Sequence, residues 1–326
     1  MRRDHHLDIV KGLAVIMMSF VHVNIFFLNK QNLILDNITK WGAISCFSAF
    51  LLISGILVGK SINKGKKPNW FKIIKRTSFI YIVYLVIGLL SWYVAEGSLT
   101  ISEIDNIIIL YELPLLSEYL INFLLLSLLF RIGYGFFKKV SKSIVLTMLL
   151  SVGIYLLGQY LYSIELLNNV WFKGLFVGIG DYHYFPLFQY LPIYLLGIYL
   201  GRRDERKTYI YAFISVLIGY VLLKFLNIAF WRRFPPSPLF LLESLLIPMF
   251  IFALLKAFKA KFRVLPIEIY AKNSLLSLLL LTVITLLLAL FLPNNVGILA
   301  VWGINIAVLV VTAVLLQAYK KIVKMV

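Results

Sequence analysis

Charged residues are scarce in this chain. They make up 14% of its 326 residues, whereas 61% are hydrophobic. A soluble domain has about 25% charged residues, so the composition excludes one. Apolar runs of about 20 residues recur along the whole length, and a helix needs that length to cross a bilayer. A β-barrel would instead have short alternating segments. We therefore predict an all-α polytopic integral membrane protein.

Cysteine is nearly absent: Cys46 is the only one. The chain therefore has no intramolecular disulfide and no cysteine-rich metal site, and we expect no metal. The sequence also lacks repeats, a glycine-rich nucleotide loop and loops long enough for a soluble domain. We expect a single transmembrane domain over residues 1–326, with an uncleaved first span. Whatever it does takes place within or beside the membrane.

Acidic residues are few, 14 against 32 lysines and arginines. We place about ten spans, at roughly 9–28, 41–60, 73–94, 118–137, 143–163, 184–201, 208–229, 239–258, 268–291 and 297–319. Residues 104–116 are apolar but short and contain Pro114, which indicates an interfacial or re-entrant segment and not a further span.

The basic residues are distributed unevenly between the two sides of this topology. With the N-terminus inside, 24 of the 32 fall at the inner side and 6 at the outer side. Because Lys and Arg concentrate in cytoplasmic loops, both termini are expected to be cytoplasmic, in the cytoplasmic membrane. The positive charge then reports orientation, and we expect no nucleic-acid partner.

The first span contains three polar residues that are costly in lipid, Asp8, Lys11 and His22. An ionisable group near the bilayer centre costs at least about 2.5–3.5 kcal/mol. His22 follows Lys11 by about 16 Å on nearly the same helix face, and Asp8 can pair with Lys11 at i, i+3. One explanation is structural: a snorkelling lysine paired to Asp8, and a histidine bonded in the bundle core. The other is a cavity where His22 acts as general base and Lys11 binds an anionic substrate.

The opening "LDIVKGLAVIMMSFVH" resembles the first span of the acyltransferase family 3 membrane proteins and their relatives, including heparan-α-glucosaminide acetyltransferase-like proteins and glucan succinyltransferases. Further similar stretches are "FSAFLLISGILVGKS" from Phe47, "WFKIIKRTSFIYIVY" from Trp70, "YFPLFQYLPIYLLGIYLGRR" from Tyr184 and "RRFPPSPLFLLESL". Two features depart from the family. Lys11 stands where arginine is commoner, and "AKNSLLSLLLLTVITL" lacks the histidine often found in a late span.

The resemblance implies an acyltransferase that uses cytosolic acyl-coenzyme A, acetyl-coenzyme A in particular. His22 would deprotonate the acceptor or carry the acyl group, Lys11 would hold the donor, and Asp8 would orient Lys11. Ser54 is either a close-packing residue beside Gly55 or a hydroxyl facing the donor. The basic entry to the third span either anchors the helix or binds the donor's phosphates; its residues are Lys72, Lys75 and Arg76.

Three residues at the outer side are candidates for acceptor binding: His183, Arg232 and Arg233. An exposed loop histidine and a rigid "FPPSP" turn are the structural alternatives. The two arginines break the charge rule for outer loops, so an anionic glycan or lipid is a possible contact. The expected acceptor is a hydroxyl or amine of a surface glycan or lipid-linked sugar, and membrane lipid is the surrounding partner.

Two other functions also explain some of these features. A transporter or flippase for a polar solute or lipid-linked sugar accounts for intramembrane charges, but would show paired broken helices in inverted repeats, which we do not find. A structural subunit leaves the opening stretch unexplained. The sequence leaves open the acceptor, the acyl length, direct transfer against an acyl-histidine, the oligomeric state and the role of residues 104–116.

Overall fold

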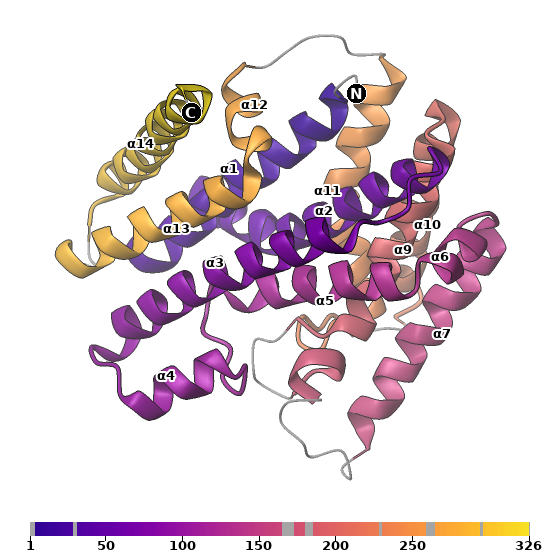
Figure 1. Ribbon diagram of the computed structural model, residues 1–326, viewed down its shortest axis with the longest axis horizontal. Coiled ribbons are helices and arrows are strands. Elements are labelled where there is room, and N and C mark those ends of the chain that lie inside the picture. Colours follow the sequence, from indigo (N-terminus) through magenta and orange to yellow (C-terminus); the bar gives the residue numbers. More distant parts are fainter. Residues whose placement is uncertain are drawn as a thin grey trace.

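The computed structural model describes residues 4–28, 31–164, 173–179, 185–227, 230–258, 265–293 and 296–325. Within these ranges the chain is helical and contains no strand (Figure 1). The helices are α1 His5–Phe27, α2 Leu33–Asn63, α3 Trp70–Glu96, α4 Ile101–Ile108, α5 Glu118–Ile132, α6 Tyr134–Val140, α7 Ile144–Ser163, the π-helical turn η2 Lys173–Val177, α9 Leu187–Arg203, α10 Arg206–Phe225, α11 Pro238–Ala257, α12 Leu265–Lys272, α13 Ser274–Phe291 and α14 Ile298–Met325.

The helix lengths confirm a polytopic membrane protein. Among the described residues, eight helices are long and apolar enough to cross a membrane, or nine if α5 and α6 are one broken span. The remaining predicted span, 184–201, corresponds to α9, which has 17 residues. Helix α4 has eight residues, too few to cross, as the sequence predicted. The hydroxyl of Tyr84 on α3 donates to the Ile107 and Glu112 carbonyls, which holds this segment against α3.

Two predicted spans are not the continuous helices that we expected. The span at 118–137 is broken after Ile132, and α6 turns away from α5 by 87°. Glycine at 133 favours such a break, because it is a poor helix former. The span at 268–291 is interrupted at Asn273, between α12 and α13. Asparagine is disfavoured inside helices and favoured at their starts.

Helix α2 lies at the centre of the bundle and packs most extensively on α9 and α1. Gly55 and Gly59 of α2 meet Gly197 and Gly201 of α9 there, and the two backbones nearly touch. A Cβ atom added at Gly55 would lie 2.9 Å from the Cα atom of Gly197, and one added at Gly197 would lie 3.0 Å from the Cα atom of Gly55. Small residues allow this approach, which is how membrane helices gain packing contacts.

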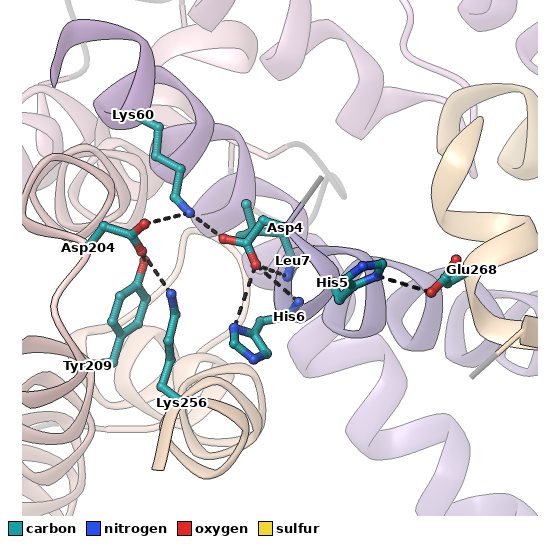
Figure 2. A network of polar contacts seen from close by, with 9 residues as sticks. All are labelled: Asp4, His5, His6, Leu7, Lys60, Asp204, Tyr209, Lys256 and Glu268. Atoms are coloured by element: carbon teal, nitrogen blue, oxygen red, sulfur yellow. Dashed lines mark hydrogen bonds and ion pairs between the residues drawn. The ribbon is translucent and has the colours of Figure 1, made fainter. Parts of the chain in front are cut away.

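A network of charged residues joins several helix ends at one end of the bundle (Figure 2). The Lys60 ammonium, at the end of α2, pairs with Asp4 before α1 and with Asp204 after α9, the latter at 2.9 Å. Lys256, at the end of α11, also lies 2.9 Å from Asp204. The start of α1 and the ends of α2, α9 and α11 therefore meet, which confirms the predicted alternation of helix direction. We call this the charged end.

The pKa of the Asp4 carboxyl reflects its place in this network. Burial raises that pKa, but the hydrogen bond and charge of Lys60, with help from Lys256 and His6, outweigh burial and hold the pKa below its ordinary value of 3.8. Because the folded-state pKa is lowered, the stability that this carboxylate contributes is present above its ordinary pKa. It is lost as the pH falls through the lowered value.

Replacing Lys60 by methionine should destabilise the bundle. The change removes two partly buried ion pairs and leaves Asp4 and Asp204 with fewer partners, so we expect a loss of about 1–3 kcal/mol in the free energy of unfolding. Thermal unfolding of the detergent-purified protein measures it. Lys64→Met is the matched control, because Lys64 is exposed one turn later. Equal melting temperatures for the two variants would show that the network contributes no stability.

Candidate functional site: two cavities along the first helix

A cavity of about 460 Å³ opens beside the first half of α1. Lys11 and Ser54 line it from α1 and α2, Arg76 from α3, and Lys272 from the end of α12. We call it the Lys11 cavity. Ser54 and Arg76 also line an adjoining cavity of about 240 Å³. Tyr319 of α14 completes the wall, so the start of α1 and the end of α14 lie at the same end of the bundle. That this end faces the cytoplasm stays a prediction.

The break at Asn273 adds to the positive character of the Lys11 cavity. Residues 273–276, the beginning of α13, line it. The first N–H groups of a helix have no partner within the helix and carry partial positive charge. Three cationic side chains and one helix N-terminus therefore surround a single space, an arrangement suited to a polyanion.

The other residues predicted to serve the donor do not line the Lys11 cavity. Lys72 and Lys75 are exposed on α3 and line none of the cavities described here, so the geometry brings only Arg76 of the basic entry to the site. Asp8 is buried, at 6% exposure, one turn before the partly buried Lys11. The structure thus places Asp8 and Lys11 on the same part of α1.

A second cavity, of about 240 Å³, lies beside the other half of α1 and contains His22. We call it the His22 cavity. Glu118 lines it from the first turn of α5 and Arg233 from the segment before α11, with Cys46 and Phe47 from α2. Leu115 and Leu116, from the segment that follows α4, close one side. A histidine, a carboxylate and a guanidinium therefore share a small, otherwise apolar space.

Several polar atoms around the His22 cavity are buried without a hydrogen-bond partner. Glu118 is only 7% exposed, and its Oε2 atom has no hydrogen-bond partner. The Tyr119 hydroxyl and the Arg233 Nε atom are also without one. Leaving a buried polar atom unpaired costs about 1–3 kcal/mol. All three residues line the His22 cavity, so water or a polar ligand that enters it finds hydrogen-bond partners there.

His22 itself is 3% exposed, and its Nδ1 atom lies 3.1 Å from the Oγ1 atom of Thr282 on α13. If Nδ1 carries the proton and donates it to Thr282, the Nε2 atom is left as the acceptor. Thr282 belongs to the stretch in which the family often has a late histidine. Here that stretch supplies a hydroxyl that contacts His22.

The outer candidates divide between two places. Arg233 lines the His22 cavity and donates to the Ala43 carbonyl at 3.3 Å. Arg232 is exposed and points away from that cavity, with its Nη2 atom 3.3 Å from the Gln159 Oε1 atom. His183 lies outside the described residues.

An aromatic layer separates the two cavities. Phe50 and Phe123 line the Lys11 cavity, whereas Phe47 and Tyr119 line the His22 cavity. The ring centroids of Phe47 and Phe123 are 5.7 Å apart, those of Phe50 and Phe123 6.5 Å, and those of Phe47 and Tyr119 6.3 Å. These are edge-on contacts of the kind that aromatic pairs prefer. The layer is closed in this structure.

Sequence reasoning missed Glu118, Thr282 and Lys272. Glu118 was read as one of several acids of an outer loop, and nothing in a single sequence distinguishes it from Glu112 or Glu103. Lys272 was read as an inner anchor. A signal for Thr282 was present, because it lies in the stretch that was compared with the family's late histidine, but the sequence alone did not connect that stretch with His22.

Comparison with known families gives one match. The family model described as heparan-alpha-glucosaminide N-acetyltransferase, catalytic, matches residues 3–222, about two thirds of the chain. The matched range contains Lys11, His22, Arg76 and Glu118. No curated protein and no solved structure matches the chain. Because the match spans more than half of the chain, this protein belongs to the heparan-alpha-glucosaminide N-acetyltransferase catalytic family of membrane transferases.

Proposed function

We propose that the protein transfers an acetyl group from acetyl-coenzyme A in the Lys11 cavity to a hydroxyl or amine of a glycan or lipid-linked sugar in the His22 cavity. One observation carries the proposal. A chain of an N-acetyltransferase family places a cationic cavity and a histidine cavity on the same helix, on opposite sides of one aromatic layer. We further propose that it works in the cytoplasmic membrane with the charged end inside, as the loop charges predict.

The Lys11 cavity suits the donor. The phosphates of coenzyme A are polyanionic, and three cations with a helix N-terminus favour them. The thioester must reach the aromatic layer, because the eleven residues from Lys11 to His22 span about 16 Å of helix. An extended donor therefore lies along α1, with its phosphates near Lys11 and its acetyl group directed toward His22.

The His22 cavity supplies the chemistry and holds the acceptor. The His22 Nε2 atom removes a proton from the acceptor, whose oxygen or nitrogen attacks the thioester carbonyl. The C–S bond breaks, and the proton passes to the departing thiolate. Alternatively, the His22 Nε2 atom attacks the thioester carbonyl itself, the C–S bond breaks, and coenzyme A leaves as the thiol with the imidazole proton. The acceptor then attacks the acetyl-imidazole, and its proton returns to the ring. Glu118 and Arg233 provide a carboxyl group and a guanidinium for acceptor hydrogen bonds.

Family membership favours transfer over a transporter or flippase. The two functions also differ in what happens to the donor. An acyltransferase consumes acetyl-coenzyme A and leaves free coenzyme A, whereas a transporter moves its solute unchanged. Incubating the purified protein with acetyl-labelled donor, and following the label into membrane extracts, distinguishes them.

Replacing Arg76 by glutamine should weaken donor binding about tenfold or more, because one charged contact to phosphate contributes about 1.5–3 kcal/mol. The measurement is the dissociation constant of labelled acetyl-coenzyme A for the protein in detergent. Lys75→Gln is the matched control. It removes the same charge from the preceding residue, which lines neither of the two cavities that Arg76 lines. Equal effects of the two changes would mean that general surface charge, and not the Lys11 cavity, attracts the donor.

A further inference from the structure

A large apolar groove lies on the lipid-facing side of the bundle, away from both cavities. It has a volume of about 690 Å³ and is lined by α7, α9, α10 and α11. Helix α7 packs on α9 and helix α10 packs on α11, so α7 and α10 form the walls. Small residues make it deep, among them Ser151 on α7 and Ala212 and Ser215 on α10. We call it the α7–α10 groove.

The groove follows α7 from Ile144 to Leu156, which is roughly 18 Å of helix, enough to hold a stretch of hydrocarbon chain. One helical turn beyond Leu156, the Arg232 guanidinium lies near the end of the groove. Tyr155 lines the groove, and Gln159 donates to the Tyr155 hydroxyl at 3.1 Å. The Arg232 guanidinium is next in line, bonded to Gln159 and lying 5.5 Å over the Tyr162 ring.

The guanidinium of Arg232 is held in place by hydrogen bonds that use only some of its N–H donors. Its Nε atom donates to the Pro235 carbonyl at 3.1 Å and its Nη2 atom contacts Gln159. An arginine has five N–H donors, and this side chain is exposed at the end of an apolar groove. A fixed cation at the end of a hydrocarbon-lined groove is complementary to a chain that bears a phosphate.

The groove and the His22 cavity are joined through adjacent residues. Arg232 contacts Gln159, one turn beyond the groove, whereas Arg233 and Phe234 line the His22 cavity. Pro238, a few residues later, lines the groove. The segment before α11 therefore lies between the groove and the cavity, with Arg232 toward α7 and Arg233 in the cavity.

We propose that the α7–α10 groove binds the hydrocarbon chain of a phosphate-bearing lipid, that Arg232 binds its phosphate, and that Arg233 receives its head group in the His22 cavity. This rests on the proposed function and narrows the acceptor to a lipid-linked one. A groove that holds only ordinary bilayer lipid would not need to end beside a segment that also lines the site.

Binding of farnesyl phosphate to the purified protein, measured by native mass spectrometry, tests the site without any acetyl transfer. Farnesol and inorganic phosphate supply the chain and the phosphate alone. We expect farnesyl phosphate to bind more tightly than either. Arg232→Gln should weaken farnesyl phosphate about tenfold and leave farnesol unchanged, whereas Ser215→Trp should displace both.

Two matched variants serve as controls. Lys224→Gln removes an exposed cation elsewhere, and Val221→Trp adds the same bulk to α10 outside the groove; neither should alter binding. The proposal is overturned if farnesyl phosphate binds no better than farnesol, or if Arg232→Gln weakens its binding no more than Lys224→Gln does.

A transfer measurement separates this proposal from the proposed function. Labelled acetyl groups should appear in organic-solvent extracts of membranes with the wild type, and fall with Arg232→Gln. Label that passes only to water-soluble sugars would overturn the lipid-linked acceptor and leave acetyl transfer intact. No acetyl transfer, with farnesyl phosphate still bound through Arg232, would overturn the proposed function and leave the lipid site intact.

Discussion

Replacing His22 by alanine should lower the rate of acetyl transfer by about 10²–10⁴-fold, the usual contribution of a general base, while acetyl-coenzyme A still binds. The imidazole lies in the His22 cavity, across the aromatic layer from the cations of the Lys11 cavity, so we expect binding and chemistry to separate. Single-turnover transfer and donor dissociation constants, measured on the same preparations, check this. A variant that loses donor binding as well would show that His22 maintains the fold.

The contact with Thr282 gives this prediction a finer control. Thr282→Val should slow transfer, because it removes the hydroxyl 3.1 Å from the His22 Nδ1 atom and frees the ring to change orientation or tautomer. Thr282→Ser keeps the hydroxyl and should restore the rate. If valine and serine behave alike, the hydroxyl does not orient His22. Acetyl label left on denatured wild-type protein without acceptor would identify the acyl-histidine route.

Replacing Gly201 by alanine should destabilise the protein by about 3 kcal/mol. The added methyl group would collide with the Ile56 carbonyl of α2, and a backbone atom cannot swing aside as a side chain can. Separating α2 from α9 loosens the most extensive helix contact in the bundle, which places this change at the upper end of overpacking costs. Unfolding in a denaturing detergent, followed by circular dichroism, measures the loss.

A glycine-to-alanine substitution at a position with free space should instead raise the free energy of unfolding. Gly153 on α7 has nothing within 4 Å of an added Cβ atom, so Gly153→Ala should stabilise by about 0.5–1 kcal/mol through helix propensity alone. If both variants move the unfolding midpoint the same way, the close approach of α2 and α9 does not limit stability.

The sequence predicted the membrane fold because the information is local. Each apolar run carries its own length signal, and the alternation of basic loops fixes helix direction, which the network at the charged end confirms. The helix breaks at Gly133 and Asn273 were missed because hydropathy is averaged over a window and does not detect where one helix ends and the next begins. The run 268–291 is apolar on average although Glu268, Lys272 and Asn273 lie at its start, and average hydropathy does not register that the helix restarts there. The missed break is what points the beginning of α13 at the Lys11 cavity.

The candidate site was predictable only in part. Lys11 and His22 lie on one helix, so their spacing places them relative to each other. Glu118 comes from α5, and only tertiary packing brings it to His22. Charge alone could not separate Arg76 from Lys75, because which of two adjacent lysine or arginine side chains turns toward a cavity depends on how α3 is rotated. The roles of these residues stay predictions.

The aromatic layer between the two cavities has an electrical consequence. Both cavities reach into the membrane from opposite ends of α1, and together they would form a water-filled path past His22 if nothing closed the middle. Phe47, Phe50 and Phe123 fill that position with rings. Hydrophobic constrictions of this kind exclude water and ions. In the proposed transfer, a two-carbon group would therefore pass between compartments without discharging the proton gradient or the voltage across the membrane.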